Sequence, residues 1–235
     1  MGTDATASTK NIHCHRKFIR YLRMKILSKC RLYAFVDTAY LRGRDPAWVA
    51  RQLCEGGADL VQLRAKNSTP DDVRRLAKAI LPVTRAAAFG LVVNDHPAIA
   101  LEMGAEFCHL GQEDFFDAGH ADCSELKTKS ASLRIGLSTH APEQAMRALA
   151  AKPDYIAIGP VYATGTKPGA KAVTLEYVRW AAANVDIPWF AIGGINLENL
   201  DEVLAVGARG VCVVSAILNA PDIADMCRRF KERLV

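Results

Sequence analysis

The chain has 235 residues, of which 50% are hydrophobic and 23% are charged, so it can bury a sizeable core. This composition excludes an intrinsically disordered protein, and no apolar stretch approaches the roughly 20 residues of a membrane-spanning helix. The net charge of +5 lies at the N-terminus, because residues 1–31 hold eight Lys or Arg against one acid, whereas the other 204 residues hold 22 against 24. We therefore expect a nearly neutral body that binds neither nucleic acid nor membrane.

Residues 1–30 are predicted to form an N-terminal extension that is partly disordered or contains a short helix. Residues 15–28 mix basic and apolar side chains at roughly helical spacing, but they lack the apolar core of a secretory signal peptide. A nucleic-acid arm, a helix on an anionic membrane and an organelle-targeting peptide stay open beside a helix that only covers one end of the domain.

The seven cysteines are an odd number and include no C-x-x-C pair, and Cys108 and Cys212 lie inside apolar runs. This usage favours reduced thiols, so a cytoplasmic protein is predicted. The six histidines lack the spacing of a zinc site. The oligomeric state stays open, and a homo-oligomer is compatible with the sequence.

From residue 31 onward, short apolar runs alternate with longer amphipathic segments. Continuous apolar runs are typical of parallel strands that are buried on both faces. The predicted strands are 31–36, 59–63, 90–93, 106–110, 134–137, 155–158, 188–192 and 210–214.

Capping residues mark several helices between these strands. Thr69-Pro70-Asp71-Asp72 combines a cap, a proline and two acids, and Pro142 opens another helix. Asn196 is expected to begin a third helix that ends near Gly207, and the segment 219–222 begins the last.

Eight strand–helix units without a break in composition predict an α/β protein, a single (β/α)8 TIM barrel over residues 31–235. An open, doubly wound sheet is the structural alternative. Residues 112–133 are longer and more polar, so an irregular helix or loop is expected there.

Residues that can bind ligands or take part in catalysis follow nearly every predicted strand. The active site of such a barrel lies at these carboxyl ends of the strands. Any one of them could be a turn residue, but their joint placement predicts a site. They are Gln62, Arg64, Lys66, Asn94, Asp95, Gln112, Asp114, Ser138, His140, Thr164, Thr166, Lys167, Gly193, Gly194, Val214 and Ser215.

The residues after strands 2 to 4 indicate a site for an anion and a metal ion. Gln62, Arg64 and Lys66 alternate, so they share one face of an extended strand, and the two cations can hold an anionic group. Asp95 and Asp114 are the acids that follow strands 3 and 4, and two carboxylates suit Mg²⁺. A helix cap at Asp95 and a solvated loop at Asp114 are the structural alternatives.

The residues after strands 6 to 8 indicate a second anion site. Gly193-Gly194 and Val214-Ser215 stand where barrels of this kind bind phosphate through backbone N–H groups. Thr164, Thr166 and Lys167 lie in a loop that is not a Walker A motif and that could close over an anion. One site suits a diphosphate and the other a monophosphate, which suggests diphosphate as a leaving group.

The two histidines near the strand ends are less informative. His109 lies within a strand, where a core role is expected, and for His140 helix capping, support of the site and proton transfer all stay open.

Six motifs, in order, give residues 31–225 a resemblance to the thiamine phosphate synthase (thiamine-phosphate pyrophosphorylase) family. They are VQLRAK at 61–66, VVNDH at 92–96, HLGQED at 109–114, GLSTH at 136–140, AIGPVYATGTK at 157–167, and AIGGI with VVSAI at 191–195 and 213–217.

The resemblance implies a Mg²⁺-dependent transferase that joins 4-amino-5-hydroxymethyl-2-methylpyrimidine diphosphate to 4-methyl-5-(2-hydroxyethyl)thiazole phosphate. It implies that Asp95 and Asp114 carry Mg²⁺. The residues that it assigns to substrates fall into three groups: Arg64, Lys66, Asn94 and Lys167 at the diphosphate; Gln62, Asn94 and Ser138 at the pyrimidine; and Thr164, Thr166, Gly194, Val214 and Ser215 at the thiazole phosphate.

The sequence departs from that family at Ala65, where an acid is usual, and a lost supporting salt bridge is expected there. A thiazole tautomerase on the same barrel is the nearest alternative, with His140 as its proton shuttle. That family lacks the Asn94-Asp95 pair and the second metal acid, so these residues favour the synthase. A non-catalytic barrel that binds thiamine precursors is the other alternative.

Overall fold

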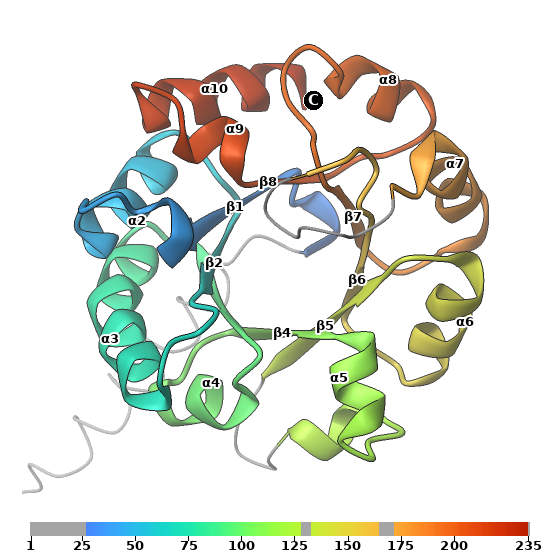
Figure 1. The fold of residues 1–235 in the computed structure, drawn as a ribbon, viewed down its shortest axis with the longest axis horizontal. Helices are drawn as coiled ribbons and strands as arrows, with labels where there is room; N and C mark the ends of the chain where they lie inside the picture. Colours follow the sequence, from blue (N-terminus) through green and yellow to red (C-terminus); the bar gives the residue numbers. More distant parts are fainter. Residues whose placement is uncertain (1–26, 128–132, 165–171, 235) are drawn as a thin grey trace, which may run out of the picture.

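A closed barrel of parallel strands forms the centre of the molecule. The computed structural model describes residues 27–127, 133–164 and 172–234. Each strand is hydrogen-bonded to the next, and β1 pairs with β8 through Leu32 and Val211. The helices form a ring outside the strands (Figure 1). The predicted (β/α)8 barrel is confirmed, and the open sheet is excluded because β1 and β8 close the circle.

All eight predicted strands are present, with bounds that differ from the expected ones by two residues at most. Their central residues are buried, as expected for strands covered on both faces. The strands are β1 (Leu32–Asp37), β2 (Leu60–Arg64), β3 (Gly90–Asn94), β4 (Phe107–Gly111), β5 (Arg134–Thr139), β6 (Tyr155–Ile158), β7 (Trp189–Ile192) and β8 (Val211–Val213).

The helices lie between the strands in the sequence and cover the barrel from outside. The α-helices are α2 (Pro46–Glu55), α3 (Pro70–Ala86), α4 (Pro97–Met103), α5 (Gln112–Asp117), α6 (Pro142–Ala150), α7 (Thr174–Asn184), α8 (Leu200–Ala205), α9 (Ser215–Leu218) and α10 (Ile223–Arg233). Short 3-10 turns are η1 (Leu27–Lys29), η2 (Thr38–Tyr40) and η3 (Cys123–Leu126).

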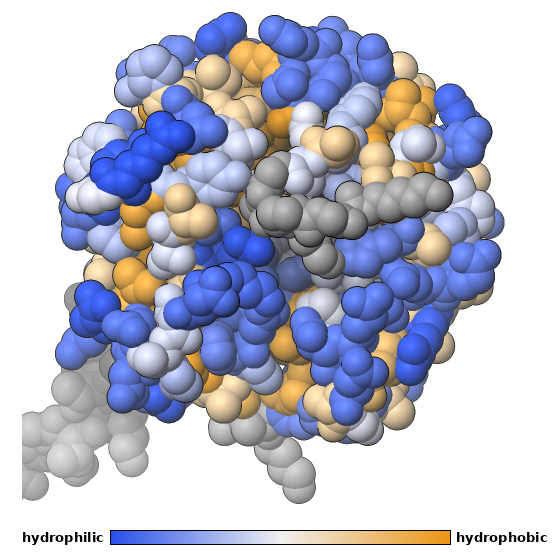
Figure 2. All heavy atoms as spheres, in the orientation of Figure 1, coloured by the Kyte–Doolittle hydropathy of each residue, from blue (hydrophilic) through white to orange (hydrophobic). Residues whose placement is uncertain are grey.

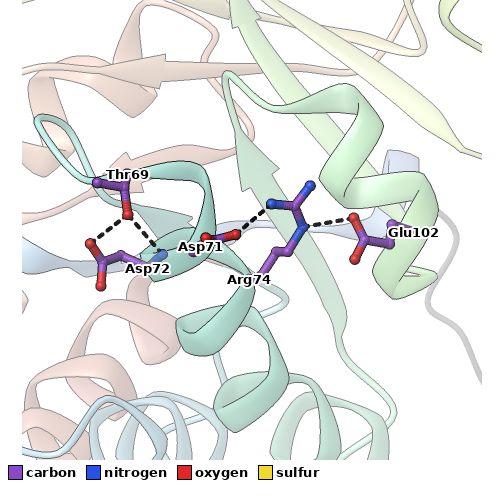
Figure 3. Close-up of polar contacts among 5 residues, drawn as sticks. All are labelled: Thr69, Asp71, Asp72, Arg74 and Glu102. Atoms are coloured by element: carbon purple, nitrogen blue, oxygen red, sulfur yellow. Dashed lines mark hydrogen bonds and ion pairs between the residues drawn. The ribbon is translucent and has the colours of Figure 1, made fainter.

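The start of α3 follows the predicted cap. The Thr69 hydroxyl accepts a hydrogen bond from the Asp72 backbone N–H at 3.2 Å and donates one to the Asp72 carboxylate at 2.8 Å (Figure 3). Arg74, one turn later, pairs with Asp71 and with Glu102 of α4, which links the two helices. These ion pairs are exposed, so the cap, worth about 1 kcal/mol, contributes more to stability than each pair does.

One helix begins later than the sequence predicts. The carboxamide oxygen of Asn196 accepts hydrogen bonds from the backbone N–H groups of Glu198 and Asn199, which forms a turn, and α8 begins only at Leu200. Asparagine side chains stabilise such turns as readily as helix starts, which is why the prediction was wrong. Gly207 follows the end of α8 with φ +104°, as expected for a residue that ends a helix.

Two predicted segments lie wholly or partly outside the described residues. Of the N-terminal extension, residues 1–26 are not described, so its form stays a prediction. The expected irregular stretch at 112–133 contains α5 and η3, and residues 128–132 within it are not described.

Six of the seven cysteines lie within the described ranges. The six cysteines there form no disulfide, and burial raises the pKa of the Cys54 and Cys227 thiols to about 12. None of the helices described is long and apolar enough to cross a membrane.

A buried carboxylate holds together the end of the barrel at which the strands begin. Asp59 Oδ2 accepts hydrogen bonds from the backbone N–H groups of Arg31 and Leu32, at 2.8 and 2.9 Å, and from Lys231 Nζ at 2.7 Å. The Asp59 side chain is 1% exposed. It therefore connects the start of β1 to α10.

We expect Asp59→Ala to lower the free energy of unfolding by about 3 kcal/mol, because it leaves Lys231 and two backbone N–H groups, that of Leu32 buried, without this acceptor. Denaturant titration measures this as a lower midpoint. Asp186→Ala is the control, because that side chain is exposed and makes no hydrogen bond or ion pair within the described ranges. Equal midpoints for the two variants would contradict the assignment.

Candidate active site

The predicted site residues meet at one pocket of about 240 Å³ at the carboxyl ends of the strands. Figure 2 shows hydrophilic residues gathered around the hollowed middle of this face. Gln112 does not line the pocket, because it is buried in the first turn of α5, and Thr166 and Lys167 lie outside the described residues. The predicted residues that do line the pocket are Gln62, Arg64, Lys66, Asn94, Asp95, Asp114, Ser138, His140, Thr164, Gly193, Gly194, Val214 and Ser215.

Two cations stand on one side of this pocket, each beside a carboxylate. Asp37 and Arg64 are in register at the ends of β1 and β2, and Arg64 Nη1 lies 2.8 Å from Asp37 Oδ2. The Asp37 side chain is 1% exposed and also accepts a hydrogen bond from the Ala39 N–H. Lys66 forms an ion pair with Asp95. Arg64 is thus held by a buried partner, whereas Lys66, which is half exposed, pairs near solvent.

The two acids predicted as metal ligands both line the pocket beside these cations. Asp95 adopts φ +63° and donates its backbone N–H to His109 O at 2.8 Å. Asp114 lies in the first turn of α5, and a Cβ added at Gly111 would stand 2.6 Å from Asp114 Oδ2. The glycine therefore leaves the space that this carboxylate occupies.

This donor set fits Mg²⁺ better than a transition metal. Within the described residues there is no group of three or more His, Cys, Asp or Glu side chains that could hold a metal ion. Mg²⁺ takes one or two carboxylates and fills its other positions with water and substrate oxygens. Asp95 and Asp114 meet that requirement without further protein ligands.

The other side of the pocket is built from a glycine turn and the start of α9. Gly194 has φ +65°, and a Cβ there would lie 2.7 Å from the Cβ of Tyr162, so only glycine fits this turn. Asn199 Nδ2 fixes the turn by donating to Gly194 O at 3.0 Å. Val214 and Ser215 begin α9, and N–H groups in a first turn have no acceptor within their helix. The turn and the helix start together suit a phosphate group.

The matching family model is the one described as thiamine monophosphate synthase, and it covers residues 32–217. The thiamine-phosphate synthase of Thermus thermophilus is 46% identical over 76% of this chain and 84% of its own length. That of Acidothermus cellulolyticus is 43% identical over 88% of this chain and 96% of its own. This chain belongs to the thiamine monophosphate synthase family.

A solved structure of the same family has the same fold. The thiamine phosphate pyrophosphorylase of Pyrococcus furiosus superposes with a TM-score of 0.74 at 28% identity, over 89% of this chain and 98% of that chain. The fold and the family stated from the sequence motifs are thereby confirmed.

Two buried tyrosines that the sequence did not single out join Gln62 and His109 on the floor of this synthase-family pocket. Gln62 Nε2 donates to the Tyr33 hydroxyl at 2.5 Å, and the Tyr33 and Tyr155 hydroxyls are 3.0 Å apart. The Tyr155 hydroxyl lies 3.1 Å from His109 Nδ1. Tyr33 and Tyr155 occur in apolar runs that look like core, and only the strand register shows that their hydroxyls meet inside the barrel.

A missing side chain on β5 makes room for this floor. A Cβ added at Gly136 would lie 2.1 Å from the Tyr155 ring, so the ring crosses the space above that glycine. His109 was expected to be core. It is 8% exposed, which agrees, but its ring also lines the pocket.

Burial keeps the floor of the pocket neutral. It lowers the pKa of His109 to about 4, and the nearby charge of Asp95 only partly opposes this shift. Burial also raises the pKa of Tyr33 and Tyr155 well above the ordinary value of tyrosine. At neutral pH the floor therefore holds uncharged hydrogen-bonding groups, and the charges of the site stand around its rim.

His140 lines the pocket and is fixed by two hydrogen bonds. Its Nδ1 is hydrogen-bonded to Gly159 O, and its backbone N–H donates to Gln144 Oε1 at 2.8 Å. Because a carbonyl only accepts, Nδ1 carries the proton, which leaves Nε2 as an acceptor in the neutral ring.

Proposed function

We propose that this transferase joins 4-amino-5-hydroxymethyl-2-methylpyrimidine diphosphate to 4-methyl-5-(2-hydroxyethyl)thiazole phosphate, giving thiamine phosphate and diphosphate. The observation that carries this proposal is one pocket with two anion corners. One has two cations and two carboxylates, and the other has a glycine turn and a helix start. The membership of the chain in the thiamine monophosphate synthase family supports the same reaction.

The diphosphate binds at the corner that holds the cations. Arg64, fixed by Asp37, can form two parallel hydrogen bonds to phosphate oxygens, and Lys66 acts as a point charge. Asn94, which lines the pocket beside them, donates further hydrogen bonds. Lys167, from the part of the loop that is not described, completes this set in our proposal.

Asp95 and Asp114 would hold Mg²⁺, which neutralises the negative charge that builds on the departing diphosphate. Asp95 faces Lys66, so this corner already sets a carboxylate beside a cation before substrate arrives. Asp114 makes no ion pair with any residue of the described ranges, so its carboxylate is available to the metal ion.

The two ring substrates lie between the corners. Gln62, Asn94 and Ser138 surround the pyrimidine, whereas the thiazole phosphate binds at the glycine turn. The residues proposed for that phosphate are Thr164, Thr166, Gly194, Val214 and Ser215.

The chemistry requires positioning more than a base. The bond between the pyrimidine methylene carbon and the diphosphate oxygen breaks, and its electron pair leaves with diphosphate. The aminopyrimidine delocalises the positive charge, and the lone pair of the thiazole nitrogen then forms the new carbon–nitrogen bond. No proton is transferred, so Arg64, Lys66 and Ser138 act by binding and orienting the reactants.

The compartment and the partners that we expect are consistent with this activity. We propose that the protein acts in the cytoplasm on small phosphorylated substrates alone, without nucleic acid or membrane as partners. The cysteines of the described residues form no disulfide, which suits that compartment.

Incubation of the protein with both phosphorylated precursors, with Mg²⁺ and with a chelator, tests the proposal. Thiamine phosphate should form in proportion to diphosphate, and only with the metal ion. If no thiamine phosphate forms, and the thiazole phosphate isomerises without metal instead, the chain is a tautomerase and the proposal fails.

A further inference from the structure

The hydrogen-bonded chain of side chains on the pocket floor has two ends, and both face the pocket. Gln62 and His109 line the pocket at opposite ends of the chain, and the hydroxyls of Tyr33 and Tyr155 connect them. Within the described residues, neither Oε1 of Gln62 nor Nε2 of His109 makes a hydrogen bond to protein. These two atoms are therefore the ones that the chain offers to a ligand.

The hydrogen-bond directions along this chain are coupled. Gln62 Nε2 can only donate, so the Tyr33 hydroxyl accepts from it. The Tyr33 hydroxyl then donates its own hydrogen bond to the Tyr155 hydroxyl. Tyr155 in turn donates to His109 Nδ1, which places the ring proton of His109 on Nε2. If His109 donated from Nδ1 instead, one buried hydroxyl proton would have no acceptor, which is unfavourable.

A reversal of the chain would exchange both ends together. If the Gln62 carboxamide turned over, its Oε1 would accept from Tyr33, and every bond down to His109 would change direction. Gln62 would then present its NH2 group to the pocket as a donor, and His109 would present an unprotonated Nε2 as an acceptor. The floor thus has two states, and each of them presents one donor and one acceptor.

We propose that Tyr33, Tyr155 and His109 are positioning residues that hold the Gln62 carboxamide with Oε1 toward the pocket, so that the enzyme selects an aminopyrimidine over an oxopyrimidine. This inference rests on the proposed function. The exocyclic amino group of the substrate donates to Gln62 Oε1. An oxo group in its place is a second acceptor, which only a reversal of all the bonds in the chain would accommodate.

The first experiment measures the tautomer of His109 and needs no substrate. In ¹⁵N-histidine-labelled protein, the shifts of the two ring nitrogens identify the protonated one, and the spectrum of His109→Gln assigns the signal. We expect one tautomer, with the proton on Nε2, in the unmodified chain and a mixture in Tyr155→Phe. A proton on Nδ1 in the unmodified chain, or an unchanged tautomer in Tyr155→Phe, overturns the inference.

The second experiment compares kcat/KM for the aminopyrimidine diphosphate with that for its 4-oxo analogue. We expect Tyr155→Phe to lower the ratio of amino to oxo efficiency at least about tenfold, because the carboxamide then turns freely. A loss that is equal for both substrates would mean that Tyr155 is only structural, which overturns the inference.

Tyr177→Phe is the matched control. It also removes a buried hydroxyl, the partner of Thr139 at 2.7 Å, but it does so away from the pocket, so the ratio should stay unchanged. If the unmodified protein joins neither pyrimidine to the thiazole phosphate, the proposed function has failed. The tautomer measurement still decides the direction of the hydrogen bonds from Gln62 to His109.

Discussion

Replacing Asp114 by Asn is expected to lower Mg²⁺-supported turnover by about 100-fold or more. The substitution keeps the shape of the side chain but removes the charge that we propose binds the metal ion, and metal-assisted departure of a leaving group is worth several kcal/mol. Asp114 is the cleaner of the two acids to test, because Asp95 also partners Lys66. The rate should be measured across Mg²⁺ concentrations, and the concentration that gives half of the maximal rate should rise.

Glu113→Gln is the control for Asp114. Glu113 precedes it in the same first turn of α5 and is also exposed, but it does not line the pocket. Its Mg²⁺ profile should match that of the unmodified protein. If Asp114→Asn and Asp95→Asn both keep the Mg²⁺ profile of the unmodified protein, neither carboxylate is a ligand of the metal ion.

Asp37→Asn is expected to lower kcat/KM for the pyrimidine diphosphate by about tenfold to 100-fold. The carboxamide oxygen of the variant would still accept from the Ala39 N–H, but the Arg64 guanidinium would lose the charged partner that orients it. A misplaced anion-binding group costs rate as well as affinity. We also expect a loss of about 2 kcal/mol in the free energy of unfolding, since Arg64 keeps some contact with water.

Asp71→Asn provides the comparison for Asp37. It breaks an aspartate–arginine pair of similar length, 2.9 Å, on the exposed surface of α3, where the pair contributes little. Neither kcat/KM nor the unfolding midpoint should change. If Asp37→Asn behaves in the same way, Arg64 does not depend on its buried partner.

The barrel and the rim of the pocket were predictable from the sequence because each rests on a local pattern. Continuous apolar runs mark strands that are buried on both faces, and polar residues after them mark the strand ends. Gln62, Arg64 and Lys66 could be grouped from spacing alone, because every second residue of a strand shares a face. All three line the pocket.

The parts that were missed depend on contacts between distant strands. Asp37 is a single acid after an apolar run, and only the register of β1 with β2 shows that it faces Arg64. Tyr33 and Tyr155 are 122 residues apart, so nothing local shows that their hydroxyls meet. The position of Asn196 was misread for the opposite reason, because one local signal serves both a turn and a helix start.

The seam between β1 and β8 has a consequence for synthesis of the chain. β8 is the last of the eight strands, and Lys231, which reaches back to Asp59 beside β1, follows it by 18 residues. Until both have left the ribosome, β1 and β7 each present an open edge of unpaired backbone groups. Val214 and Ser215, which follow β8 directly, line the pocket. A nascent chain therefore closes its sheet and completes this side of the pocket only late in synthesis, and until then its open strand edges favour aggregation.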